Sequence, residues 1–91
     1  MDPRVREAVL EKIDSAISNT DEVSDIVSKL NLSVDSRSDF AYGVAIGRIY
    51  NSFHYQTRRI LKRNATREEF DEFLEVLKLK AAAIKSALGG E

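Results

Sequence analysis

The spacing of hydrophobic residues constrains this chain more than any other feature of its sequence. In four segments, apolar side chains recur three or four positions apart, the repeat that places them on one side of an α-helix. The clearest stripe runs along the last segment and comprises Phe70, Phe73, Leu74, Leu77, Ala81, Ile84 and Leu88. The sequence contains no β-hairpin signal. The pattern therefore predicts an all-α protein.

Residues that favour helix ends divide the chain into four helices. Asp2 followed by Pro3 is typical of a helix start, and Thr66 with Glu69 three residues later matches a capping box. We expect helices over about residues 3–18, 21–31, 37–63 and 67–88, with residues 1–91 in a single domain. The predicted fold is a small four-helix bundle in which the last two helices form a long hairpin.

The third and fourth predicted helices have apolar residues on more than one side. At 100° per residue, the main side of the third helix collects Tyr42, Ile46, Ile49, Tyr50, Phe53, Ile60 and Leu61. Phe40 and Val44 lie on roughly the opposite side of that helix. Val76 and Leu79 likewise lie away from the main stripe of the fourth helix. Either the first two helices or a partner chain covers these second faces.

Small residues in the third helix favour a partner chain. Ala41 and Ala45, like Gly43 and Gly47, are four residues apart, a spacing that lets another helix backbone approach closely. A chain of 10.2 kDa without cysteine also has a modest core and no disulfides, so oligomerisation is a plausible source of stability. We expect a homodimer that completes or extends the bundle, with an interface at Phe40, Gly43, Val44, Gly47, Val76 and Leu79.

The formal net charge of −1 conceals a strong separation of charge along the sequence. Residues 1–39 carry five basic and nine acidic side chains, residues 40–67 six basic and none acidic, and residues 68–91 three basic and six acidic. One interpretation is a phosphate- or nucleic-acid-binding patch formed by Arg58, Arg59, Lys62 and Arg63. The interpretation that we favour is mutual neutralisation between this basic helix end and the acids that begin the next helix.

Composition argues against several other classes of protein. The absence of cysteine and the presence of a single histidine, His54, leave no common zinc site and no multi-histidine metal site, and no set of catalytic residues stands out. We therefore expect no enzymatic activity, no metal and no cofactor. The longest apolar stretch is far too short to cross a bilayer, and the first residues do not resemble a signal peptide. We expect a cytoplasmic protein without a membrane partner.

Taken together, these features predict a small helical protein-interaction module that is homodimeric and non-enzymatic. A different protein is a second candidate partner. The alternative is a nucleic-acid-binding module that uses the basic end of the third helix. The two hypotheses require different surfaces: an apolar interface for the homodimer and the basic end of the third helix for nucleic acid.

Overall fold

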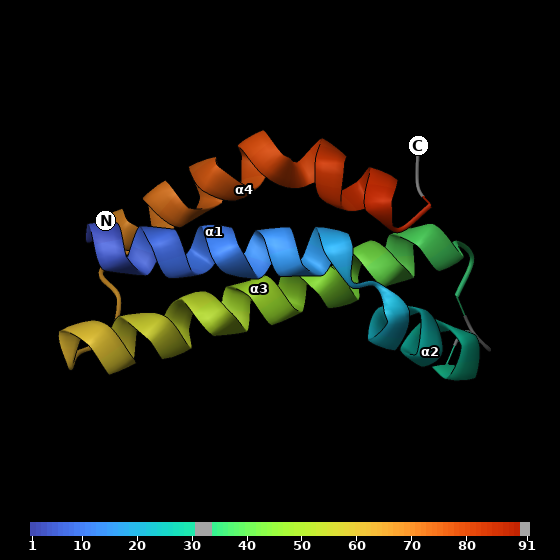
Figure 1. The fold of residues 1–91 in the computed structure, drawn as a ribbon, viewed down its shortest axis with the longest axis horizontal. Coiled ribbons are helices and arrows are strands. Elements are labelled where there is room, and N and C mark those ends of the chain that lie inside the picture. Colours follow the sequence, from blue (N-terminus) through green and yellow to red (C-terminus); the bar gives the residue numbers. More distant parts are fainter. Residues whose placement is uncertain (31–33, 90–91) are drawn as a thin grey trace.

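The computed structural model describes residues 1–30 and 34–89, and these residues form four helices and no strand (Figure 1). They are α1 (Pro3–Ser18), α2 (Asp21–Leu30), α3 (Arg37–Leu61) and α4 (Arg67–Ala87). The all-α, four-helix prediction is confirmed. Asn31, the predicted last residue of the second helix, lies outside the described residues.

Local hydrogen bonds fix the starts of α1 and α3. The carboxylate of Asp2 accepts a bond from the backbone N–H of Arg4 at 2.8 Å, and Pro3 occupies the first turn of α1. The hydroxyl of Ser36 accepts a bond from the backbone N–H of Asp39 at 3.1 Å at the start of α3. These side chains satisfy backbone donors that have no partner within the helix, which is why each helix begins where it does.

The end of α3 differs from the prediction. The helix stops at Leu61 and not at Arg63, because Lys62 adopts a left-handed backbone conformation with φ 60°. The backbone N–H of Lys62 still donates to the carbonyl of Arg58 at 3.0 Å, and the chain then reverses direction. A single left-handed residue after a helix is a common way to end it. Arg63 therefore belongs to the turn that leads into α4.

The main hydrophobic core is organised around α1. This helix lies between α3 and α4 and packs on each of them more extensively than they pack on each other (Figure 1). Val5, Val9 and Ile13 supply its buried side. Next to them, the rings of Phe53 and Phe73 stack at a centroid distance of 4.4 Å and join α3 to α4. Three helices therefore share one core along most of the long axis.

The short helix α2 packs on the second apolar side of α3, where Phe40 and Val44 lie. Val23 and Val27 of α2 form a second buried cluster with Ala41, and Phe40 and Val44 pack against that cluster. Of the two explanations for the second apolar face of α3, the cover by another helix of the same chain is therefore correct for Phe40 and Val44.

The predicted buried side of α3 is largely confirmed: Ile49 and Phe53 are buried, and Tyr42, Ile46, Ile60 and Leu61 pack against the main core. The buried residues of α3 are spaced by four and comprise Ala41, Ala45, Ile49, Phe53 and Thr57. Such a row winds slowly around the helix, so that α3 contacts different helices along its length. Tyr50, also predicted to be buried, is instead 45% exposed.

The predicted apolar stripe of α4 supplies Phe73, Leu77 and Ile84 to the core, with two differences at its edges. Val76 is only 4% exposed and belongs to the main core, although the sequence places it away from the main apolar stripe. Leu74, a member of that stripe, is 43% exposed. The molecule measures 39 × 21 × 21 Å along its principal axes. In the described part of the chain, no helix combines the length and the apolar character needed to span a membrane.

Candidate interaction surfaces

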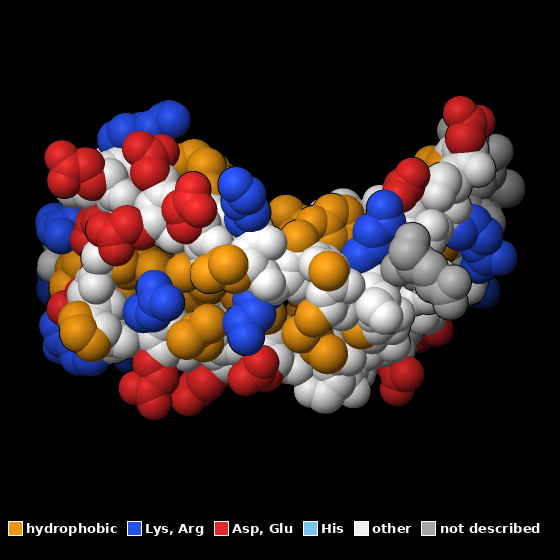
Figure 2. Space-filling model, turned by 90° about the horizontal axis from the view of Figure 1, so that it is seen from above, with side chains coloured by type: hydrophobic (Ala, Val, Ile, Leu, Met, Phe, Trp, Pro, Cys, Tyr) orange, Lys and Arg blue, Asp and Glu red, His pale blue; other side chains and the backbone are white. Residues whose placement is uncertain are grey.

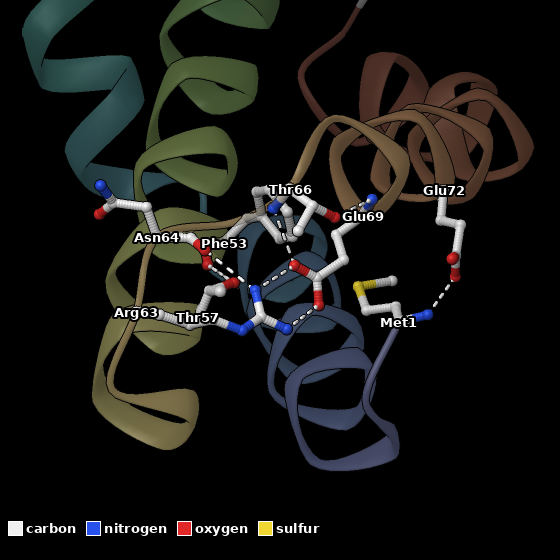
Figure 3. Close-up of polar contacts among 8 residues, drawn as sticks. All are labelled: Met1, Phe53, Thr57, Arg63, Asn64, Thr66, Glu69 and Glu72. Carbon is white, nitrogen blue, oxygen red and sulfur yellow. Dashed lines mark hydrogen bonds and ion pairs between the residues drawn. The ribbon is translucent and has the colours of Figure 1, made fainter.

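One residue of the predicted basic patch, Arg63, forms an ion pair with Glu69 in the first turn of α4. Its guanidinium group donates two bonds to the carboxylate of Glu69, at 2.8 and 3.1 Å (Figure 3). The same carboxylate accepts a bond from the backbone N–H of Thr66 at 2.8 Å, and the hydroxyl of Thr66 accepts one from the backbone N–H of Glu69 at 3.1 Å. The predicted capping box is thus present, and it is extended by an ion pair across the turn.

The electrostatic environment of Glu69 reflects these contacts. The hydrogen bonds from Arg63, together with the bond from the backbone of Thr66, lower the pKa of Glu69 from 4.5 to about 2. Bonds of this kind stabilise the charged form of the carboxylate and are strong because both partners are ionised. Arg63 therefore stabilises the turn between α3 and α4, and the carboxylate of Glu69 neutralises its charge.

The other three residues of the predicted patch lie on the outside of the bundle. Arg58, Arg59 and Lys62 are exposed, and none of them forms an ion pair with any residue that the structure describes. The only side-chain bond among them joins Nε of Arg59 to the amide oxygen of Gln56 at 2.8 Å. Mutual neutralisation across the turn therefore involves Arg63, while three cations remain on the surface.

The six predicted interface residues do not share one surface. Phe40 and Val44 are partly buried against the cluster that Val23 and Val27 of α2 form with Ala41, and Val76 is buried in the main core. Leu79 is 80% exposed on the outer side of α4. Gly43 and Gly47 are exposed on α3. Apart from the backbone of its own helical turns and its two chain neighbours, a Cβ atom added to either of them would meet no described atom within 4 Å.

Two residues that the sequence assigned to the core extend the surface around these glycines. Tyr50 lies one helical turn after Gly47, and its ring contacts that of Phe70 on α4 edge-on at a centroid distance of 6.1 Å. Leu74 follows Phe70 by one turn of α4. We call the surface formed by Gly43, Gly47, Tyr50 and Leu74 the open face.

The open face is apolar and lies over an aromatic cluster. His54 packs against Tyr50 at 4.7 Å and stacks on Phe70 at 6.3 Å between ring centroids. The four residues of the open face carry no charge. In the space-filling view of Figure 2, hydrophobic side chains line a concavity near the middle of the long axis, and acidic side chains gather at the end of the molecule where α4 begins. The exposure of Tyr50 depends on how α4 is placed, and the helical repeat of the sequence contains no signal for it.

A further group of polar residues, also missed by the sequence analysis, lies between α1 and α3. A shallow hollow there is lined by Lys12, Arg48, Asn51, Ser52, Tyr55 and Gln56. The sequence analysis concentrated on the cluster at positions 58–63 because its charges are adjacent in the chain. The relation of Arg48 to Lys12 depends on the contact between two helices.

Comparison with known proteins gives no match: no family model, no curated protein and no solved structure matches this chain.

Proposed function

We propose that this chain is a non-enzymatic helical interaction module that forms a homodimer through the open face. The observation that carries the proposal is the combination at this face of exposed large apolar side chains with two glycines that have open space above them. An exposed glycine inside a helix costs roughly 1 kcal/mol relative to alanine. No packing within the described chain compensates for that cost, whereas close approach of a second helix would.

The surface area of the molecule supports this proposal. Its accessible surface is 5940 Å², whereas a compact monomer of this mass has about 5,300 Å². The excess of about 600 Å² reflects an elongated shape, 39 × 21 × 21 Å along the principal axes, which leaves surface that a partner could cover. The radius of gyration of 13.8 Å also exceeds the value of about 12 Å for a compact domain of this length.

A second copy of the chain suits the shape of the open face. Gly43 and Gly47 are four residues apart, the arrangement that lets two helix backbones cross at short distance. In a twofold arrangement, α3 of one copy would cross α3 of the other at these glycines, and Tyr50 of each copy would lie against Leu74 of its partner. Such an interface is self-complementary and requires only one patch on each chain.

The oligomeric state tests this proposal directly. Sedimentation equilibrium at tens of micromolar protein is expected to give twice the chain mass of 10.2 kDa. Gly43→Leu is expected to return the protein to the mass of one chain, because its side chain fills the space that the second helix needs. Leu74→Glu should do the same by placing an unpaired charge in the interface.

The matched control is Ala82→Leu, which adds the same side chain at an exposed position of α4 away from the open face. This variant should keep the mass of the wild-type protein. A wild-type mass of one chain would contradict the homodimer. A dimer that persists in both Gly43→Leu and Leu74→Glu would contradict the open face as its interface.

A further inference from the structure

The surface of α3 that faces away from α4 carries a row of exposed basic and aromatic residues. Arg48, Tyr55 and Arg59 are spaced by seven and four positions, so that they lie along one side of α3, and Lys62 directly follows the end of the helix. At 1.5 Å per residue, this row is about 20 Å long. Residues 40–67 contain no acidic side chain, so α3 contributes only positive charge to this side.

Two hollows along α3 have no acidic residue in their lining, and Tyr55 lines the first of them. The first is the hollow between α1 and α3, where Lys12 adds a charge to that of Arg48. The second lies at the end of α3 and is lined by Arg58, Lys62, Arg63 and Asn64. We call the surface formed by Lys12, Arg48, Tyr55, Arg58, Arg59 and Lys62 the basic face.

The cations of the basic face form few and weak ion pairs with other described residues of the chain. Arg48 contacts Glu22 at 3.6 Å, but both side chains are exposed, and such pairs contribute little to stability. Arg58, Arg59 and Lys62 have no ion-pair partner among the described residues. A phosphate group could therefore approach these cations without breaking a strong internal contact.

Acidic residues border the basic face at both ends. Glu7 and Glu11 of α1 share a third hollow with Arg4, Arg59 and Lys62. Their charge disfavours a polyanion on the α1 side of the helix end. At the other end, Glu22 lines a pocket together with Lys12 and Arg48. The five cations of the basic face outnumber these three carboxylates, and a chain of phosphates can run from Arg48 past Tyr55 to Arg59 and Lys62.

Tyr55 provides the observation that distinguishes one kind of polyanion from another. Its side chain is 55% exposed, and its ring contacts no other aromatic ring in the described part of the chain. Tyr50, by comparison, packs on His54 and Phe70. A free aromatic ring between cations is the arrangement on which an unpaired base stacks while its neighbouring phosphates are neutralised.

We propose that the basic face binds single-stranded nucleic acid, with phosphates on Arg48, Arg59 and Lys62 and a base stacked on Tyr55. An amphipathic membrane-binding surface carries several large apolar side chains next to its cations, whereas the basic face has the single aromatic ring of Tyr55. A duplex would use the cations but has no unpaired base for Tyr55. The basic face and the open face use different residues, so one chain can dimerise and bind a strand at the same time.

The test is fluorescence anisotropy with a labelled single strand of about 20 nucleotides, prepared both as DNA and as RNA. Affinity is expected to fall as salt rises, with a slope of log K against log salt of about −2 for three phosphate contacts. Arg59→Ala/Lys62→Ala should reduce the magnitude of this slope by about 1.4. Tyr55→Ala should weaken binding by about 5- to 150-fold, and Tyr55→Phe should preserve it.

A variant with the same loss of charge elsewhere provides the control. Lys29 and Lys78 are exposed on α2 and α4, outside the basic face, and Lys29→Ala/Lys78→Ala should leave the slope close to that of the wild-type protein. Circular dichroism checks that every variant keeps its helices. The absence of binding to both strands at low salt would overturn the proposal. So would equal binding of a duplex or of anionic lipid vesicles, or binding that Tyr55→Ala leaves unchanged.

Discussion

In the proposed dimer, Gly43 and Gly47 would favour assembly at the expense of the stability of the isolated chain. Both lie inside α3, where glycine gives the unfolded chain more freedom than alanine does. Apart from the backbone of its own helical turns and its two chain neighbours, neither has a described atom within 4 Å of the position that a Cβ would occupy. The free energy of unfolding of one chain should therefore rise when either glycine becomes alanine.

We expect Gly43→Ala and Gly47→Ala each to raise the free energy of unfolding of the monomer by about 0.5–1 kcal/mol. Urea unfolding followed by circular dichroism, at protein concentrations low enough to keep the chains apart, measures this change. Gly89 has φ 81°, so Gly89→Ala serves as the opposite control and should not stabilise the protein. A loss of stability in both α3 variants would show that the space above the glycines is occupied within the monomer.

At the scale of elements, the turn between α3 and α4 depends on a carboxylate whose charge is held by its neighbours. The pKa of Glu69 is lowered to about 2, below its ordinary value of 4.5. A group with a lowered pKa stabilises the fold fully above its unfolded pKa, and this stabilisation is lost as the pH falls towards its folded pKa. The contribution of Glu69 is therefore complete above about pH 4.5 and declines between pH 4.5 and pH 2.

We expect Glu69→Ala to lower the free energy of unfolding at neutral pH by about 1–2 kcal/mol, because it removes the carboxylate that accepts from the backbone N–H of Thr66 and pairs with Arg63. The difference from the wild-type protein should shrink as the pH falls from about 4.5 to 2. Chemical unfolding at a series of pH values provides the measurement. Glu68→Ala, at an exposed position in the same turn, should have a smaller effect. A difference from wild type that stays constant through the acid range would contradict the assigned role of Glu69.

The elements also show which parts of the structure the sequence could predict. The start of α4 depends on contacts between Thr66 and Glu69, which are neighbours in the chain, so a sequence pattern suffices to locate it. The exposure of Tyr50 and the burial of Val76 depend on the rotation of α3 and α4 against other helices. A projection at a fixed angle per residue contains no information about that rotation.

The same distinction applies to the candidate surfaces. The sequence identified Arg58, Arg59 and Lys62 because their charges are adjacent, and these three remain on the surface. It also included Arg63, whose contact with Glu69 requires the turn to be closed. Arg48 and Lys12 line one hollow only after α1 and α3 have packed together, so no pattern along the chain relates them.

At the scale of the whole molecule, the proposed assembly would couple the stability of the fold to protein concentration. A monomer with about 600 Å² more surface than a compact chain of its mass leaves apolar groups in contact with water. Burial of these groups in a dimer stabilises the folded form by mass action, and the stabilisation grows as the concentration of chains increases.

We expect the midpoint of thermal unfolding to rise with protein concentration for the wild-type chain, as it does for proteins that fold together with their partners. Gly43→Leu should unfold at a temperature that does not depend on concentration, because it cannot form the dimer. Scans by differential scanning fluorimetry over a hundredfold range of concentration, from about 1 to about 100 μM, make this comparison. A midpoint that is independent of concentration in both proteins would contradict the proposed dimer.

At Lys62, the stability of the turn and the charge of the basic face favour different residues. A residue with a Cβ atom is less stable at φ 60° than glycine, by roughly 1 kcal/mol, and glycine is the usual residue at such a helix end. A glycine at this position would make the turn easier to form, but it would remove one cation from the basic face. Lys62 therefore makes the turn after α3 less stable than glycine would, and it also supplies a cation that a phosphate would contact.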